Sequence, residues 1–133
     1  MDRDEIIALM AGRRLFEGAS PELLGELVDQ GEFISFKNGD NLISQGEIGE
    51  AIWVLLSGSV VIYIDEVAQQ RIDDCGAILG EISAVSHTSA TATVKAATDV
   101  SALSIPHQSF HKALASSEKL ATSVLRSLAK YLG

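Results

Sequence analysis

The sequence predicts a mainly β fold with flanking helices, organised as a β-roll. Between residues 32 and 105 the chain consists of short β-prone runs separated by turn residues. The segments before and after this region carry apolar residues at helical spacing. At 133 residues the chain is long enough for one hydrophobic core and too short for two, so we expect a single domain over 1–133.

Two helices are predicted within residues 1–31, before the β-roll. The first is expected as one amphipathic helix over residues 4–16. The second begins after Ser20, a favoured N-cap residue, with Pro21 at its first helical position. The predicted buried positions are Ile6, Ile7, Leu9, Met10 and Leu15 in the first helix and Leu23, Leu24, Leu27 and Val28 in the second.

The middle of the chain contains seven β-prone runs, with Asn-Gly and single glycines between them. In order they read EFISF, NLIS, AIWVLLSG, SVVIYI, QRID, ATATVKA and DVSALSI. Many short strands at close spacing are typical of a sandwich, a jelly roll or a small barrel. Pro106 is expected to end the last strand because its nitrogen cannot donate to a ladder.

Two further helices are predicted within residues 106–133. They cover the runs HQSFHKALA and SEKLATSVLRSLAKYL. The second run has an apolar stripe formed by Leu120, Val124, Leu125, Leu128 and Leu132. This stripe either packs on the β-roll or pairs in part with another copy or a partner, so a homodimer through the C-terminal helix stays open.

Composition narrows the classes of partner. The formal net charge is −8, and the ten Lys and Arg residues are scattered, which argues against nucleic-acid binding. No apolar run has signal-peptide quality or bilayer length, so we expect a cytoplasmic protein with no membrane contact. Cys75 is the single cysteine and is expected to be an inert thiol in a turn.

Nothing in the sequence argues for catalysis. There is no Gly-x-Ser-x-Gly elbow and no Cys/His cluster at zinc spacing. His107 and His111 lie four residues apart and could form a metal pair, but no third ligand is evident, and two surface or half-buried histidines are favoured. His87 is expected to be solvated in a polar turn. We therefore predict no enzyme, no catalytic residue, no metal and no cofactor.

The stretch GEISAVSHTSATATVKA, from Gly80 to Ala96, is the candidate binding site. Gly80 allows a close approach of the backbone to a ligand. Residues 81–83 would form the first helical turn, whose N–H groups favour an anion. The residues alone do not separate such a site from an ordinary strand, turn and helix.

Three short motifs extend this interpretation: Gly39-Asp40, Gln45-Gly46-Glu47 and Ser57-Gly58. With these motifs in this order, nearly the whole chain resembles the cyclic nucleotide-binding domain family, which includes the catabolite activator protein, protein kinase A regulatory subunits and cyclic-nucleotide-gated channels. The resemblance implies an eight-stranded β-roll (jelly roll) over 32–105. It also implies N-terminal helices and a C-terminal hinge helix and lid.

Residues 79–93 resemble the phosphate-binding cassette of that family. Gly80 matches the cassette glycine, and Leu79 replaces the usual phenylalanine. Glu81 matches the glutamate that accepts a hydrogen bond from the ribose 2′-hydroxyl, although a plain helix-start carboxylate is the alternative. Ile82 and Ser83 match the positions whose backbone N–H groups meet the cyclic phosphate.

The cassette departs from the family pattern at Ala90, which falls on the position of the phosphate-binding arginine. Thr91 matches the small or hydroxyl residue that follows. Lys95 matches an outward-facing position and is an unlikely substitute. We therefore expect a regulatory module that binds a cyclic nucleotide, cAMP or cGMP, weakly and signals to an unknown effector protein through its C-terminal helices. The alternative is a degenerate member that acts as an interaction or dimerisation module without nucleotide.

Overall fold

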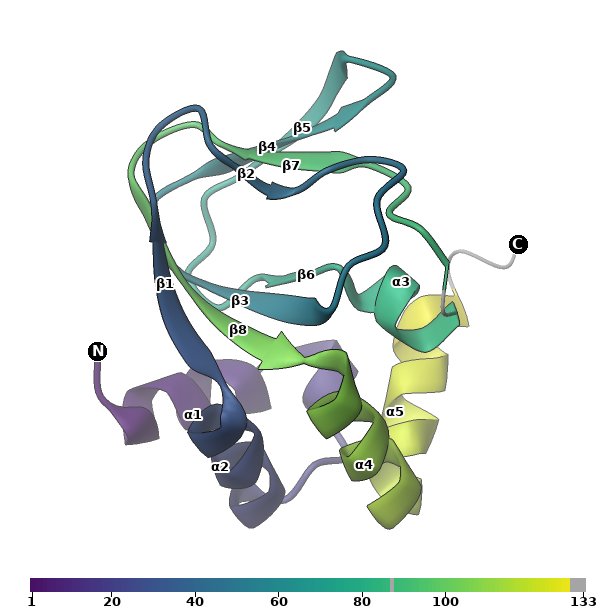
Figure 1. Ribbon diagram of the computed structural model, residues 1–133. Helices are drawn as coiled ribbons and strands as arrows, with labels where there is room; N and C mark the ends of the chain where they lie inside the picture. The colour runs from purple at the N-terminus through teal and green to yellow at the C-terminus, as the bar shows by residue number, and fades with distance from the viewer. Residues whose placement is uncertain (87, 130–133) are drawn as a thin grey trace.

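Eight strands and five α-helices make up the part of the chain that the computed structural model describes, residues 1–86 and 88–129 (Figure 1). The helices are α1 (Arg3–Ala11), α2 (Pro21–Gln30), α3 (Glu81–Ser86), α4 (His107–Ser116) and α5 (Glu118–Leu128), with a 3-10 helix, η1, at Arg14–Phe16. The strands are β1 (Glu32–Phe36), β2 (Asn41–Ile43), β3 (Ala51–Ser57), β4 (Val60–Ile64), β5 (Val67–Ile72), β6 (Ile78–Leu79), β7 (Thr93–Ala96) and β8 (Val100–Pro106).

The strands form two four-stranded antiparallel sheets. Their orders are β1-β8-β3-β6 and β2-β7-β4-β5, so neighbours in a sheet are mostly distant in sequence. In Figure 1 the two sheets enclose the interior of the roll, and α1, α2, α4 and α5 cover the outer face of the first sheet. This arrangement confirms the predicted mainly β fold, an eight-stranded β-roll with helices at both ends.

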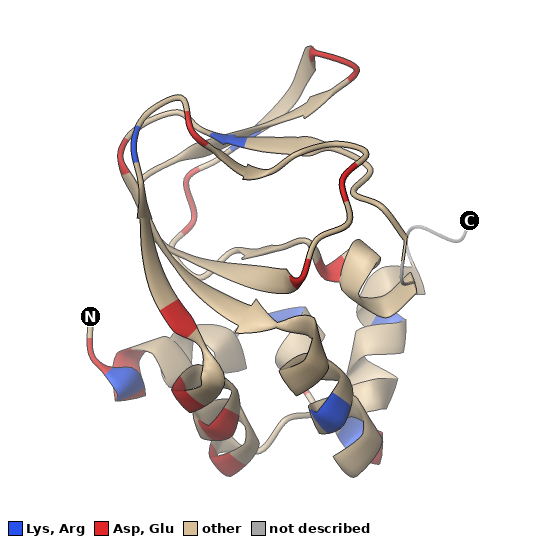
Figure 2. Ribbon diagram, in the orientation of Figure 1, with Lys and Arg blue, Asp and Glu red and all other residues tan. Residues whose placement is uncertain are grey.

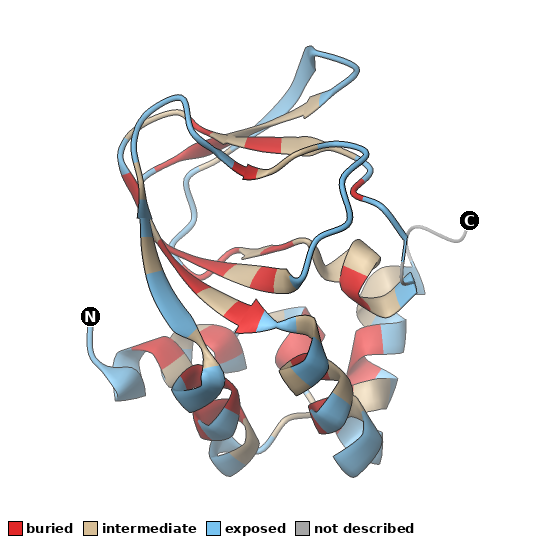
Figure 3. Ribbon diagram, viewed as in Figure 1, coloured by how far each residue is buried: buried red, intermediate tan, exposed pale blue. Residues whose placement is uncertain are grey.

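Strand β3 is buried on both faces because it separates two hydrophobic clusters. Its residues Ile52, Val54 and Leu56 belong to the cluster beneath the helices, where the rings of Phe16 and Phe110 meet edge to face with centroids 6.3 Å apart. The alternate residue Leu55 belongs to the cluster inside the roll. Figure 3 shows buried segments in this sheet and in the helices beneath it, whereas β5 is mostly exposed.

The predicted single helix over residues 4–16 is wrong, because the helix stops at Ala11. Gly12 caps it, Arg13 is extended (φ −94°, ψ 138°), and the chain re-enters a 3-10 turn. Arg13 is held in this conformation from outside its own segment, since its Nη2 donates to the carbonyl oxygen of Cys75 at 2.8 Å. The break turns Leu15 and Phe16 into the core.

The start of α2 agrees with the prediction. The hydroxyl of Ser20 accepts a hydrogen bond from the backbone N–H of Leu23 at 3.2 Å, and Pro21 is the first helical residue. The seven predicted β-prone runs each overlap a strand, and Pro106 is the last residue of β8. Strand β6 is the addition, and β5 begins at Val67, earlier than the run QRID predicted.

The C-terminal stripe is divided between core and surface. Leu120 and Val124 are buried in the cluster beneath the helices, and Leu128 packs against it. Leu125 is 67% exposed, and Leu132 lies outside the described residues. Packing on the domain therefore accounts for three of the stripe positions and leaves Leu125 on the surface.

None of the helices found in the described part of the chain is long and apolar enough to cross a bilayer.

Candidate functional site

All six residues predicted to contact a ligand line one cavity of about 360 Å³ inside the roll. They are Gly80, Glu81, Ile82, Ser83, Ala90 and Thr91. The remaining wall is mainly apolar and comes from strands β2, β4, β5, β6 and β7. Its isoleucines are Ile43, Ile62, Ile64, Ile72 and Ile78. The volume lies within the usual range of small-molecule sites.

The sharp entry into α3 depends on Gly80. Strand β6 pairs with β3, Leu79 lying opposite Trp53, and the chain must then leave the sheet at once to start the helix. Gly80 makes this turn with φ of +82°, a region that side chains with a Cβ rarely adopt. The turn places Glu81 at the first position of α3, against the cavity.

Hydroxyl groups shape the loop between α3 and β7. Ser86 Oγ donates to the carbonyl oxygen of Ile82 at 2.7 Å and lies 2.7 Å from the hydroxyl oxygen of Thr88. The hydroxyl of Ser83 reaches the carbonyl oxygen of Ser89 at 3.4 Å. These contacts join the end of α3 to the loop that follows it. His87, predicted to be solvated here, lies outside the described residues.

Ala90 is held firmly by its backbone although its side chain is small. Its N–H donates to the carbonyl oxygen of Glu47 at 2.9 Å, and its carbonyl oxygen accepts from the N–H of Gly46 at 2.8 Å. The motif Gln45-Gly46-Glu47 therefore fixes the position of the cassette loop. Ala90 is only 7% exposed. It also lines a second cavity of about 290 Å³, whose lining includes Trp53.

One carboxylate lines the cavity beside α3. Among its described lining residues, Glu81 alone has an ionisable side chain. Lys95 on β7 lines a different hollow, together with Tyr63 of β4 and Asp65 of the β4-β5 turn. Figure 2 shows the same separation, with an acidic segment at the start of α3 and most basic segments on the helices or at the turns.

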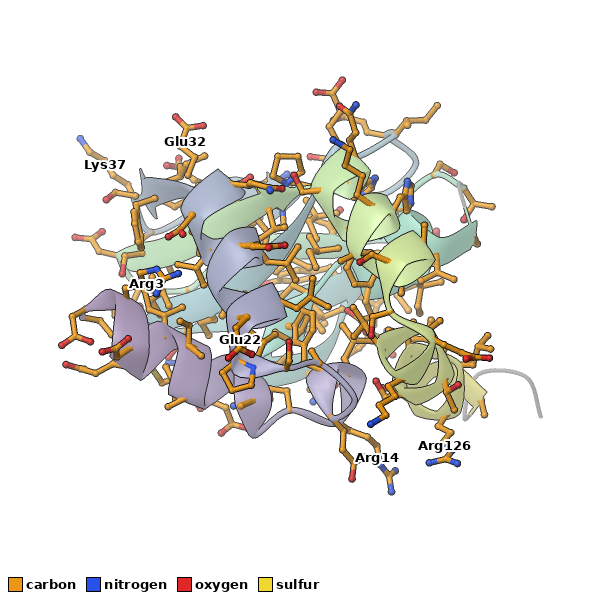
Figure 4. The ribbon with its side chains drawn as sticks, turned by 90° about the horizontal axis from the view of Figure 1, so that it is seen from below. Arg3, Arg14, Glu22, Glu32, Lys37 and Arg126 are labelled. Carbon is orange, nitrogen blue, oxygen red and sulfur yellow. The ribbon has the colours of Figure 1, made fainter. Side chains whose placement is uncertain are left out.

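The charges on the helical side project away from the core. Figure 4 shows Arg14 and Arg126 at the edge of the helical layer, pointing outward. Arg3 forms an exposed ion pair with Asp29 at 2.7 Å, and this neighbour lowers the pKa of the Asp29 carboxyl. None of these groups lines the cavity described above.

The cassette helix is tied to the C-terminal helices by a histidine. Nε2 of His111 on α4 donates to the carbonyl oxygen of Ala84 on α3, and the two atoms lie 2.6 Å apart. Ala84 is fully buried and follows Ser83 of the cavity wall. The sequence predicted His107 and His111 as two surface or half-buried histidines, with a metal pair as the alternative, and did not indicate the bond to Ala84. No group of three or more side chains suited to a metal occurs in residues 1–86 and 88–129.

Comparison with known proteins defines the class. The sequence profile of the cyclic nucleotide-binding domain matches residues 33–117, and the chain belongs to this family. Members of the family serve as regulatory domains, alone or fused to other domains.

Particular relatives fall into several kinds. The Pycsar effector protein RsmPycTIR of Rhodovulum sp. is 29% identical over 99 residues, covering 71% of this chain and 38% of that protein. The CRP-like cAMP-activated global transcriptional regulator of Mycobacterium tuberculosis is 26% identical over 133 residues, covering 97% of this chain and 58% of the regulator. The chain thus spans less than two thirds of each of these relatives.

Solved structures agree on the fold. The sensor domain of the transcriptional regulator DNR from Pseudomonas aeruginosa has a TM-score of 0.86 and 24% identity, covering 98% of this chain and 90% of that one. The cAMP-bound PfPKA-R has a TM-score of 0.81 and 19% identity, covering 97% of this chain and 44% of that one.

Proposed function

We propose that the chain is a cytoplasmic, non-enzymatic regulatory module that binds a cyclic nucleotide, cAMP or cGMP, weakly in the cavity beside α3. The observation that carries this proposal is the convergence of all six cassette positions on that cavity. Two of its relatives are named for cAMP: the mycobacterial regulator is cAMP-activated and PfPKA-R is cAMP-bound.

Each cassette residue has a role in the proposal. Glu81 accepts a hydrogen bond from the ribose 2′-hydroxyl, a donor that a carboxylate in a largely apolar cavity can use. The backbone N–H groups of Ile82 and Ser83 meet the phosphate, and the hydroxyl of Thr91 adds a neutral donor. The isoleucines of β4 and β5 form an apolar wall for the base.

Ala90 makes the binding weak. A guanidinium would join two phosphate oxygens through charge-assisted hydrogen bonds, whereas alanine has neither a charge nor a side-chain donor. Charged hydrogen bonds contribute about 1.5 to 3 kcal/mol, which corresponds to about ten- to a few-hundred-fold in affinity. The net charge of −8 also gives an anionic ligand no help in approaching the protein.

Ligand binding is transmitted to the effector by movement of the C-terminal helices. The bond between His111 and Ala84 joins α4 to the helix that bears the cassette, so a displacement of α3 would pull on α4. A ligand moves such an element only if it binds the two positions with unequal affinity. An effector protein would then recognise the displaced C-terminal helices.

An interaction module without nucleotide is the second candidate. It is favoured by Leu125, which is 67% exposed on α5 although Leu120 and Val124 of the same stripe are buried. Under this proposal the exposed leucine contacts another copy or a partner, and the cavity is a remnant of the family fold.

Calorimetric titration with cAMP and with cGMP separates the two candidates. We expect a measurable dissociation constant for at least one nucleotide and no detectable binding by Glu81→Ala with its fold intact. Glu32→Ala is the matched control, because this exposed carboxylate lies on β1, outside the cavity lining (Figure 4). Titration of Glu81→Ala like wild type would show that the site is misassigned.

A further inference from the structure

The wall that β4 and β5 contribute to the cavity beside α3 carries one polar side chain, that of Gln70. The other residues of this wall are Ile62, Ile64 and Ile72. Ile62 and Gln70 lie opposite each other in the ladder between the two strands, and opposite residues share one face of a sheet. Both residues line the cavity, so Gln70 faces inward among the isoleucines.

The neighbouring glutamine, Gln69, is placed differently. The register between β4 and β5 passes from the pair Ile62–Gln70 to the pair Tyr63–Ala68, so Gln69 is the extra residue of a β-bulge. Its Nε2 donates to the carbonyl oxygen of Val67 at 3.0 Å, and Gln69 is not among the described residues that line the cavity. Two adjacent glutamines therefore differ, since one is bonded within β5 and the other faces the cavity.

A base that covers this wall must meet the hydrogen-bonding groups of Gln70. Under the proposed function the ribose and the phosphate occupy the cassette side of the cavity, and the base lies against β4 and β5. The carboxamide of Gln70 has one acceptor oxygen and an amino group with two N–H donors. Contact with the base removes water from these groups, and a polar group that loses water without gaining a hydrogen bond lowers the affinity.

The two purine bases match a carboxamide differently. Adenine has an amino group between the acceptors N1 and N7, so a carboxamide can donate and accept at once on either side of that group. Guanine has two neighbouring acceptors, O6 and N7, on one edge, where the carboxamide oxygen gains no bond. On its other edge O6 and N1–H do match a carboxamide, but the 2-amino group on that edge needs an acceptor as well, which isoleucine side chains do not offer.

We propose that Gln70 is the residue that selects the base and that it favours adenine, so the cavity binds cAMP in preference to cGMP. The inference rests on the proposed function, since it uses the same cavity and the same orientation of the nucleotide. It adds a property that the cassette does not determine, because in that proposal the cassette residues meet only the ribose and the phosphate, which the two nucleotides share.

The first test is a calorimetric titration of wild-type protein with cAMP, with cGMP and with purine riboside 3′,5′-cyclic monophosphate, an analogue that lacks the 6-amino group. Water competes for the amide, because β5 is exposed except at Ile72, so we take the low end of the range for an amide that contacts a base at two points. We expect wild type to bind cAMP about fivefold more tightly than cGMP, and also more tightly than the analogue.

Variants at Gln70 test the residue itself. Gln70→Leu keeps a side chain of similar size without hydrogen-bonding groups, so it should lose most of the preference and bind cAMP and the analogue alike. Gln70→Glu offers only acceptors, which match N1–H and the 2-amino group of guanine, and should shift the ratio of the two dissociation constants toward cGMP. This ratio is the readout because both nucleotides carry the same phosphate. Gln69→Leu is the matched control and should leave the ratio unchanged.

The outcomes distinguish this inference from the proposed function. Equal affinity of wild type for cAMP and cGMP, or tighter binding of cGMP, would overturn the inference and leave the proposed function standing. A preference for cAMP that survives in folded Gln70→Leu, or that Gln69→Leu removes to the same extent, would show that another residue selects the base. Failure of folded wild-type protein to bind any of the three nucleotides would overturn the proposed function and the inference with it. The comparison of cAMP with the analogue needs only wild-type protein.

Discussion

At the level of single residues, Gly80 has the most restrictive backbone requirement in the site. Its φ of +82° is unfavourable for any residue with a Cβ, and such a conformation costs about 1 to 2 kcal/mol. We expect Gly80→Ala to lower the free energy of unfolding by about that amount, measured by urea denaturation. Gly49→Ala is the control, because its φ is ordinary and its Cβ would meet open space. Equal stability of the two variants would contradict this expectation.

Asp73 provides a pH-dependent test outside the site. The hydroxyl of Ser59 and then the guanidinium of Arg71 donate to its carboxylate and lower the pKa of Asp73. A depressed folded pKa adds stability above the unfolded pKa, near 4, and this contribution is lost as pH falls through the folded pKa. Ser59→Ala should therefore destabilise the protein more at pH 7 than at pH 2.

Thermal unfolding of Ser59→Ala and wild type at both pH values measures this difference. An NMR titration of the Asp73 carboxyl should show its pKa move upward in the variant. Asp29 is an internal control, because its partner is Arg3 and the substitution leaves that pair in place. A difference in melting temperature that is the same at both pH values would contradict the assignment.

At the level of elements, the β4-β5 hairpin turns on two residues with positive φ, Asp65 (49°) and Glu66 (67°). Gln45 holds Asp65 through two hydrogen bonds, of 3.0 and 2.9 Å, and aspartate tolerates this conformation better than glutamate does. Two-residue turns of this kind favour glycine at the second position. We expect Glu66→Gly to stabilise the protein by about 0.5 to 1 kcal/mol in urea denaturation, and Glu66→Ala to give no such gain.

The hydrogen bond between His111 on α4 and Ala84 on α3 leads to a second prediction at the level of elements. His111→Phe keeps a ring but removes the donor to the carbonyl oxygen of Ala84, so it should cost about 1 to 3 kcal/mol of stability. It should also weaken the transmission of ligand binding to α4 and α5, seen as a smaller ligand-induced change in hydrogen exchange. Lys112→Ala, one residue further along α4, is the control. An unchanged exchange response in His111→Phe would show that this bond is not the route.

Across the whole molecule, the sensor proposal predicts a divided response to ligand. Hydrogen exchange at saturating ligand should change in α3 and from about Pro106 onward. It should stay constant in β3 and β8, which are packed on both faces. Identical exchange throughout, with and without ligand, would leave a passive binder or a structural module.

Features that depend on neighbouring residues could be predicted from the amino-acid sequence. The cap at Ser20, the alternating strands and the turn at Gly80 each follow from contacts or dihedral angles within a few positions. The order and spacing of the cassette residues also predict their positions from the sequence, and the six residues line one cavity, while their contacts with a ligand stay a prediction.

Features that depend on distant partners required the folded chain. The hydrogen bond from Arg13, just beyond the end of α1, to the carbonyl oxygen of Cys75 joins distant residues, and the two-residue strand β6 exists because β3 lies beside it. The bond from His111 to Ala84 likewise joins residues 27 positions apart. These contacts arise when the chain closes loops of many residues around a shared core. No local pattern encodes such a closure, and so the cavity and its link to α4 appear only in the folded protein.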